Sequence, residues 1–179
     1  MCSPDLKMQE EQARQQQIAE QQKQAPQTAA TPAAPKVLPR TEALAESSQR
    51  AAVDTATLAG SINLTGGRFD DLRLRSYHET PDPKSPEIEL LSPRAAEHPY
   101  FAEFGWIAGQ GVSEAVPGET TQWQLSQGDK LAPGHDIELT YDNGQGLVFT
   151  RHVSVDERYM FTIVDSVQNH GAAPVTLSP

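Results

Sequence analysis

Two pairs of neighbouring carboxylates are the first candidates for chemistry in this sequence of 179 residues: Asp70 with Asp71, and Asp156 with Glu157. A glycosidase needs two carboxyl groups that face each other across a cleft. Neighbouring acids at a turn do not provide that arrangement. We therefore interpret both pairs as solvated acids at turns and assign no catalytic residue among them.

The sequence also gives no support for a metal site or a catalytic nucleophile. The single cysteine, Cys2, cannot form a disulfide or a zinc site by itself. The sequence contains neither a GxGxxG motif nor a GxSxG nucleophile motif. The five histidines are scattered, with no two of them three or four residues apart: His78, His98, His135, His152 and His170. We expect no catalytic, cofactor-binding or metal-binding residue, and no cofactor.

Arg151 is a charged residue on a face that otherwise carries apolar side chains. The run from Leu147 to Val155 alternates, so that Arg151 interrupts the apolar face and His152 lies on the opposite one. Arg151 is therefore either a residue at the rim of a sheet or one half of a buried ion pair with an acid such as Asp165. The sequence alone does not choose between them.

The segment 98–110 (HPYFAEFGWIAGQ) is the most aromatic part of the sequence. Tyr100, Phe104 and Trp106 could form a surface that stacks on a sugar or a peptide. The same residues could instead pack in the core and at the rim of a β-domain, which is the interpretation that we favour.

The elements that must position these residues lie in the second part of the chain. All eleven aromatic residues fall between Phe69 and Phe161. Residues 1–50 carry six acidic and six basic side chains, so the remaining residues carry 18 acids, 8 bases and the whole formal charge of −10. Without a basic stripe, binding to nucleic acid is not expected. No window approaches the roughly 18 apolar residues of a membrane-spanning helix.

Residues 1–50 have the composition of a tether of low order. The segment 8–24 is rich in Gln, Glu, Ala, Arg and Lys, which permits a helix there. The segment 25–40 contains four prolines, which favour an extended, semi-rigid spacer. We expect the ordered domain to occupy residues 51–179.

Short strands separated by turn residues predict an all-β domain. Apolar residues two apart flank Gly66-Gly67, which predicts a hairpin. A second hairpin is predicted around the turn 142–144, with strands at 137–141 and 147–155, and further strands at 87–91 and 159–163. Strands at this spacing, with little helix, are typical of a sandwich or barrel.

From about Thr57 onward the sequence resembles the periplasmic domain of YidC membrane protein insertases. Four blocks carry the resemblance in order: LAGSINLTGGRFDDLRLRSYHET, SPEIELLSP, HPYFAEFGW, and the segment from IELTYDNG to PVTLSP. They cover about 120 residues, and each block alone is a weak match. The tether also agrees with the family, in which such a segment follows the first transmembrane helix.

The resemblance implies part of a β-super-sandwich of the galactose-mutarotase type. It implies a periplasmic location at the bacterial inner membrane, and a non-catalytic role in the insertion and folding of inner-membrane proteins. The expected partners are the Sec translocon, its accessory subunits and nascent membrane proteins. The transmembrane bundle of the family is absent from this sequence, so we interpret the chain as a fragment and assign no insertase residue.

Two other functions stay open at this point. The first is a carbohydrate-binding β-sandwich module that uses Tyr100, Phe104 and Trp106. The second is a mutarotase-like enzyme, which would need a histidine and a carboxylate in one cleft. His152 with Asp165 or Glu138 is the only combination that we can offer for it.

Overall fold

The computed structural model describes residues 37–47 and 49–179. The chain divides into two units, Met1–Lys36 and Val37–Pro179, and the description below concerns the second. The helix predicted at 8–24 and most of the proline-rich segment lie outside the described residues. The division of the chain into a tether of residues 1–50 and a domain of residues 51–179 stays a prediction.

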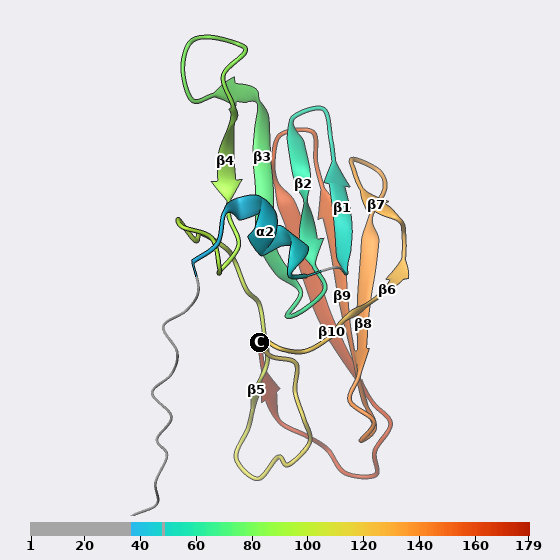
Figure 1. Cartoon of the computed structure of the whole chain (residues 1–179). Coiled ribbons are helices and arrows are strands. Elements are labelled where there is room, and N and C mark those ends of the chain that lie inside the picture. Colours follow the sequence, from blue (N-terminus) through green and yellow to red (C-terminus); the bar gives the residue numbers. More distant parts are fainter. Residues whose placement is uncertain (1–36, 48) are drawn as a thin grey trace, which may run out of the picture. The chain divides into compact units, whose positions relative to one another are not determined.

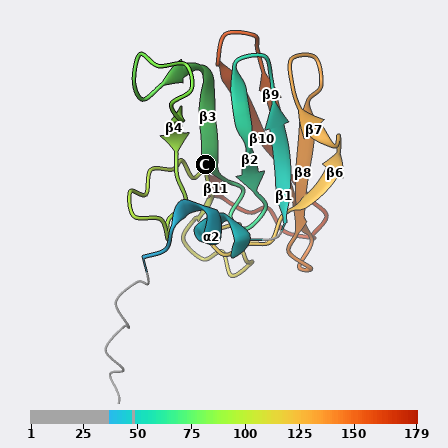
Figure 2. The ribbon, with the colours of Figure 1, turned by 45° about the horizontal axis from the view of Figure 1, so that its top comes forward.

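Two sheets, whose strands pair mainly antiparallel, form the body of the domain (Figure 1). The five-stranded sheet has the order β4-β3-β2-β1-β7: β1 (Arg50–Asp54), β2 (Leu58–Asn63), β3 (Arg68–His78), β4 (Glu87–Leu91) and β7 (Lys130–Leu131). The four-stranded sheet has the order β10-β9-β8-β6: β6 (Gln124–Gln127), β8 (Ile137–Asp142), β9 (Leu147–Val155) and β10 (Phe161–Asn169). Figures 1 and 2 both show β9 and β10 behind strands β1 to β3, with β8 and β6 to the right of β1.

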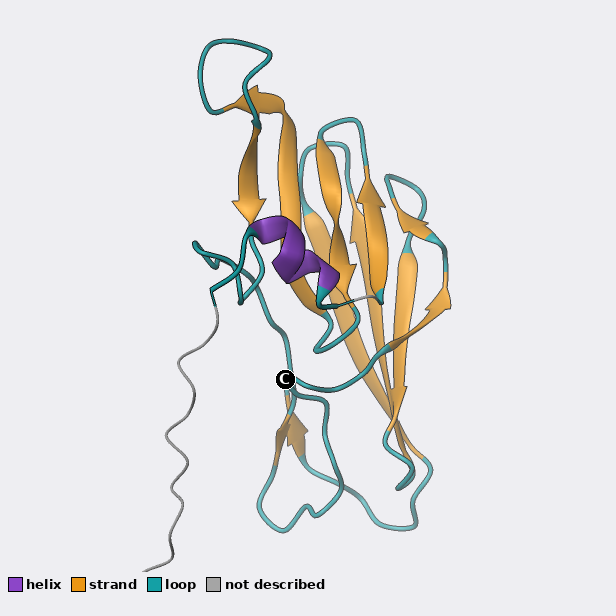
Figure 3. Cartoon of the chain, in the orientation of Figure 1, coloured by secondary structure: helices purple, strands orange, loops and turns teal. Residues whose placement is uncertain are grey.

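Smaller elements complete the described part of the chain. Strands β5 (Ile107–Ala108) and β11 (Leu177–Ser178) pair with each other as a separate two-stranded sheet. Helix α2 (Arg40–Ala45) is the purple element of Figure 3. Among the described residues, no helix has both the length and the apolar character to span a membrane.

The hairpin of β2 and β3 forms as the sequence predicts. Gly66 and Gly67 have φ angles of 77° and 59°, a region that glycine enters without steric cost. Gly60 in β2 has a different reason to be glycine, because a Cβ there would lie 1.9 Å from the backbone oxygen of Asp71. The hairpin therefore brings its two strands together at a spot where no side chain fits.

The core lies between the two sheets. Strand β9 alternates buried and half-buried residues along its whole length, and its buried side chains meet those of β2 and β3. Each fully buried aliphatic or aromatic side chain contributes about 1.5–3 kcal/mol to folding. The largest of the fully buried apolar side chains are those of Val53, Leu58, Ile62, Trp123, Leu131, Ile137, Leu139, Leu147, Phe149 and Val153.

The prediction of an all-β sandwich is confirmed, and its likeness to galactose mutarotases stays a prediction. Strands 87–91 and 147–155 have the predicted bounds. Strand β1 was not predicted, because its pattern is carried by two small or branched residues, Ala51 and Val53. Between β6 and β7, at Gly128 and Asp129, the chain passes from the four-stranded sheet to the five-stranded sheet.

Candidate functional site

Arg151 is the most deeply buried charged residue among those described. Its exposure is 0%, and it stands on the core face of β9 among apolar neighbours. Its Nε and Nη2 donate to the two carboxylate oxygens of Asp165, each at 2.7 Å. Asp165 lies directly opposite on β10. Of the two sequence interpretations, the buried ion pair is therefore the right one.

The remaining faces of the Arg151 guanidinium are also occupied. Nη2 donates to the backbone oxygen of Phe104 at 3.1 Å, and Nη1 donates to that of Gly67 at 3.4 Å. The guanidinium carbon lies 5.0 Å from the ring centre of Trp123 and 5.5 Å from that of Phe104. A buried cation is tolerated when its donors are satisfied in this way. Arg151 thus connects the two sheets and the aromatic segment. Its positive charge is balanced within the domain by Asp165.

His152 lies on the other face of β9 and contacts neither carboxylate that the sequence offered. Its Nε2 is 3.0 Å from Asp136, and both side chains are about two-fifths exposed (42% and 38%). Asp165 is held by Arg151, and Glu138 accepts a hydrogen bond from Ser126. The cleft that a mutarotase-like enzyme would need is not formed by His152 with Asp165 or Glu138. Asp165 lies on the opposite face of the sheet, because neighbours along a strand point to opposite faces. Glu138 is the partner of His152 across β8 and β9, but the imidazole is paired with Asp136 instead.

The interpretation of Asp70 and Asp71 as solvated turn acids is wrong. Both lie within β3 and are buried, with exposures of 1% and 8%. The pairing of β2 with β3 shifts at this point: Ser61 is opposite Asp71, but Ile62 is opposite Phe69. Asp70 is the extra residue of a β-bulge.

The bulge explains why Phe69 and Leu72 are both core residues although they are three positions apart. Asp70 and Asp71 both bind polar groups outside this core. Asp71 accepts hydrogen bonds from Arg40 and Ser61, and Asp70 accepts them from Arg50 and Asn63.

These contacts form a polar network that the sequence did not reveal. Arg50 also donates from Nε to Ser61 Oγ at 2.7 Å. Arg40 comes from helix α2, 31 residues before Asp71. The network is assembled across three strands and a helix, and no local spacing in the sequence identifies its members.

Asp156 and Glu157 agree with their interpretation as solvated turn acids. Both are exposed, in the turn between β9 and β10. Asp156 Oδ1 accepts hydrogen bonds from the backbone N–H groups of Arg158 at 2.7 Å and Met160 at 2.8 Å. Its role is to shape the turn, as Asp side chains commonly do.

The three aromatic residues of the suggested sugar surface have different surroundings. Trp106 is half-buried, and its ring packs 5.6 Å from that of Phe149. Phe104 is 43% exposed and packs edge-on against Phe69 at 5.9 Å. Tyr100 is 69% exposed and lines an open groove beside β4 with His98. Packing in the core and at the rim describes Phe104 and Trp106, and Tyr100 alone presents an open ring face.

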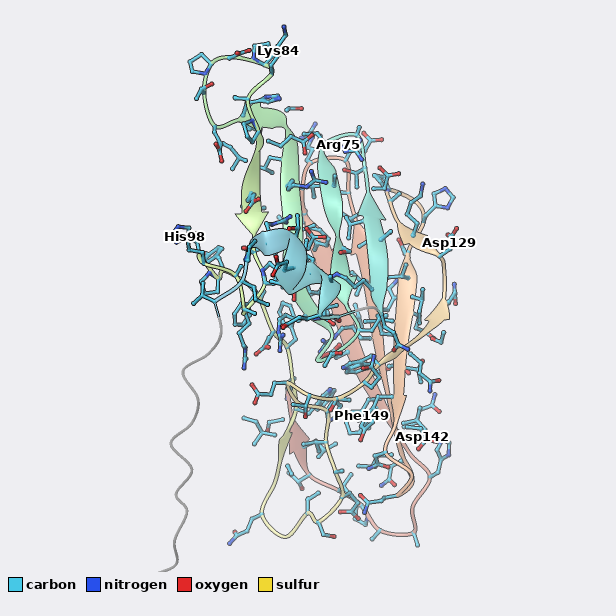
Figure 4. All side chains as sticks on the ribbon, in the orientation of Figure 1. Arg75, Lys84, His98, Asp129, Asp142 and Phe149 are labelled. Carbon is cyan, nitrogen blue, oxygen red and sulfur yellow. The ribbon has the colours of Figure 1, made fainter. Side chains whose placement is uncertain are left out.

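Figure 4 shows where several of the polar side chains lie. Phe149 lies between the layers, whereas His98, Asp129 and Asp142 lie at separate places on the surface. In residues 37–47 and 49–179, no three His, Cys, Asp or Glu side chains are grouped as metal ligands. Cys2 lies outside the described residues.

Comparison with known families decides what kind of domain this is. The family model of the YidC periplasmic domain matches residues 50–179. The chain belongs to this family. The sequence resemblance is thereby confirmed, together with the location that it implied: a periplasmic domain of a bacterial inner-membrane protein family. The YidC family is one of insertases and not of enzymes.

Curated relatives carry the name membrane protein insertase YidC. The protein of Sinorhizobium fredii is 55% identical over 139 residues, which cover 78% of this chain and 23% of the relative. That of Methylobacterium sp. is 55% identical over 142 residues, or 79% and 22% of the two chains. The protein of Bradyrhizobium diazoefficiens is 45% identical over 193 residues, or 96% and 31%.

The chain spans between a fifth and a third of the length of these YidC relatives. No solved structure matches it.

Proposed function

We propose that this chain is a non-catalytic periplasmic segment of a membrane protein insertase, which assists the insertion and folding of inner-membrane proteins, alone or with the Sec translocon. The family match over residues 50–179 carries the proposal. Relatives that are 55% identical are named membrane protein insertases.

The use of the charged residues supports a passive role. Catalytic acids and bases must reach a substrate. Arg151, Asp70 and Asp71 are instead buried in ion pairs within the domain. His152 forms a surface pair with Asp136 on the outward face of β9. In this proposal, the charges of these residues stabilise the fold.

The proposed organisation has a spacer before the domain. The proline-rich residues 25–40 would hold the domain at a distance from the membrane, as semi-rigid linkers do. Residues 51–179 would then be presented in the periplasm as a surface for partners. The partners in this proposal are nascent membrane proteins and the Sec translocon with its accessory subunits.

Such partners would bind where exposed apolar side chains are grouped on the surface. Tyr100 and Ile107 are each 69% exposed, and both lie in the aromatic segment 98–110. Photo-reactive residues at these two positions, in the full-length insertase in its membrane, test the proposal. We expect cross-links to nascent membrane proteins, and to Sec subunits when the translocon is present.

The control is a probe at Asp129, an exposed position in the turn between β6 and β7. Cross-links from Tyr100 and Ile107 that are no stronger than those from Asp129 would contradict a partner surface at the aromatic segment. Cross-links to nascent chains without any to Sec subunits would reject the Sec part of the proposal alone.

The carbohydrate-binding alternative has a separate test. Trp106 packs against the core, so a Trp106→Ala change would also disturb folding. Tyr100→Ala removes the open ring without that complication. Specific binding on a glycan array that Tyr100→Ala abolishes would favour the sugar module, and its absence would favour the insertase segment.

A further inference from the structure

Residues 38–47, here called the strap, cross the outer face of the five-stranded sheet before the family domain begins. Helix α2 forms its middle, and Figure 1 shows this helix in front of β2 and β3. The family model starts at residue 50, so the strap lies outside the part that the family defines.

The first end of the strap is fixed by backbone and apolar contacts. Leu38 forms an isolated parallel bridge with Ala96, and its N–H donates to the oxygen of Ala95 at 2.8 Å. Leu38, Ala43 and Ala96 form a small buried cluster, separate from the main core. Burial of so few and such small side chains supplies little stabilisation compared with the core between the sheets.

The middle of the strap is held by a single arginine. Arg40 donates to Asp71 on β3, and its Nε lies 3.3 Å from Glu89 on β4. Its side chain is 16% exposed, and that of Asp71 is 11% exposed. The second end is held by Ser47, whose hydroxyl donates to Asn63 Oδ1 at 2.5 Å.

With only these contacts, the strap should open more readily than the domain beneath it. Segments with few buried apolar contacts open locally, without global unfolding. Opening of the strap would expose Asp71 but would leave both sheets and the main core intact, because none of the core residues belongs to the strap.

We propose that the strap is a releasable clasp that sets where the tether leaves the domain. When it is docked, the chain is anchored to the domain from Leu38 onward, beside Ala95. When it is released, the freed residues 38–47 extend the reach of the tether by at most about 35 Å. The proposal of a longer reach rests on the proposed spacer function, whereas docking and release concern the chain itself.

Hydrogen exchange of the full chain, measured for wild type and Arg40→Gln, tests the clasp. Strap amides such as Ala43, which donates to Pro39, should exchange about tenfold faster in Arg40→Gln, as expected for the loss of one charged hydrogen bond. Exchange in β8 and β9 should not change. Arg75→Gln is the matched control, since Arg75 lies on β3, like Asp71, but pairs with Asp54 on β1 and does not contact the strap.

The rate of cleavage by a glutamyl endopeptidase at Glu42 and Glu46 is a second measure of how often the strap opens. Arg40→Gln should accelerate this cleavage. The double variant Arg40→Gln with Asp71→Asn should be cleaved only slightly faster than Arg40→Gln, because the contact between Arg40 and Asp71 is already lost in the single variant. Strap exchange that stays at the wild-type rate would overturn the proposal. Exchange that rises equally in the strap and in β9 would overturn it as well, since the strap would then open only with the whole domain.

The clasp and the insertase role fail separately. Exchange and cleavage are measured on the chain without any insertion assay, so a rigid strap would leave the proposed function standing. Absent cross-links from Tyr100 and Ile107 would equally leave the clasp standing.

Discussion

Two arginine–carboxylate networks lie on opposite sides of the five-stranded sheet. Arg151 and Asp165 are between the sheets, where the arginine is 0% exposed and its ring neighbours are Trp123 and Phe104. Arg40 and Arg50 lie on the outer face, where they bind Asp71 and Asp70 and keep partial exposure. The same pair of chemical groups thus occurs in two settings with different access to water.

The difference teaches where a charge can be removed without loss of the domain. Breaking a buried pair leaves a charge that water cannot reach, which is costly. The carboxylates of the outer network are also buried, but Arg40 and Arg50 keep 16% and 13% side-chain exposure, so water can reach their guanidinium groups once a partner is lost and the cost should be smaller. The inner network therefore secures the two sheets, whereas the outer network secures the bulge in β3 and the strap above it.

The largest expected effect comes from the inner network. Arg151→Met should lower the free energy of unfolding by about 3–5 kcal/mol, because Asp165 is left without its cation. Urea denaturation followed by fluorescence measures this. The double variant Arg151→Met with Asp165→Leu should recover much of the loss. A single variant within about 0.5 kcal/mol of wild type would show that the pair is not essential to the core.

A smaller effect tests how the inner network contacts the β2–β3 turn. A Cβ at Gly67 would lie 2.8 Å from Arg151 Nη1, and the residue also has a positive φ. Gly67→Ala should cost about 3 kcal/mol, from both the backbone conformation and the clash. Gly144→Ala has a similar φ of 69° with nothing within 4 Å, so it should cost only about 1 kcal/mol. Equal losses in the two variants would show that the contact with Arg151 does not matter.

The smallest of the three effects concerns the outer network. Asp70→Asn keeps the shape of the side chain but removes the charge that faces Arg50. We expect a loss of about 1–2 kcal/mol in thermal or urea unfolding, as for one charged hydrogen bond. Asp82→Asn, in the exposed loop before β4, is the control and should stay within about 0.5 kcal/mol. A loss as large as that of Arg151→Met would remove the distinction between the two networks.

The parts of the fold that the sequence predicted are those in which local pattern and tertiary structure agree. Gly66-Gly67 supplies the turn of one hairpin, and the alternation from Leu147 to Val155 supplies the core face of β9. Arg151 was recognised as an exception on that face for the same reason. Its partner was left open because strand register is set by pairing and not by the strand itself.

The parts that could not be predicted depend on contacts between distant residues. The bulge at Asp70 arises in the pairing of β2 with β3, and it turns two expected surface acids into buried ones. Arg40 was placed in a tether because its own surroundings are rich in proline and alanine. Only the folded sheet shows that Asp71 and Glu89 are its partners.

The central claim is that the buried charges of this domain stabilise it and take no part in catalysis. The direct test is complementation of an insertase-depleted strain by the full-length insertase with Arg151→Met and Asp165→Leu together. The account predicts insertion of membrane proteins at the wild-type level, provided that urea denaturation shows the double variant to be folded. Loss of insertion by a folded, membrane-integrated double variant would contradict it.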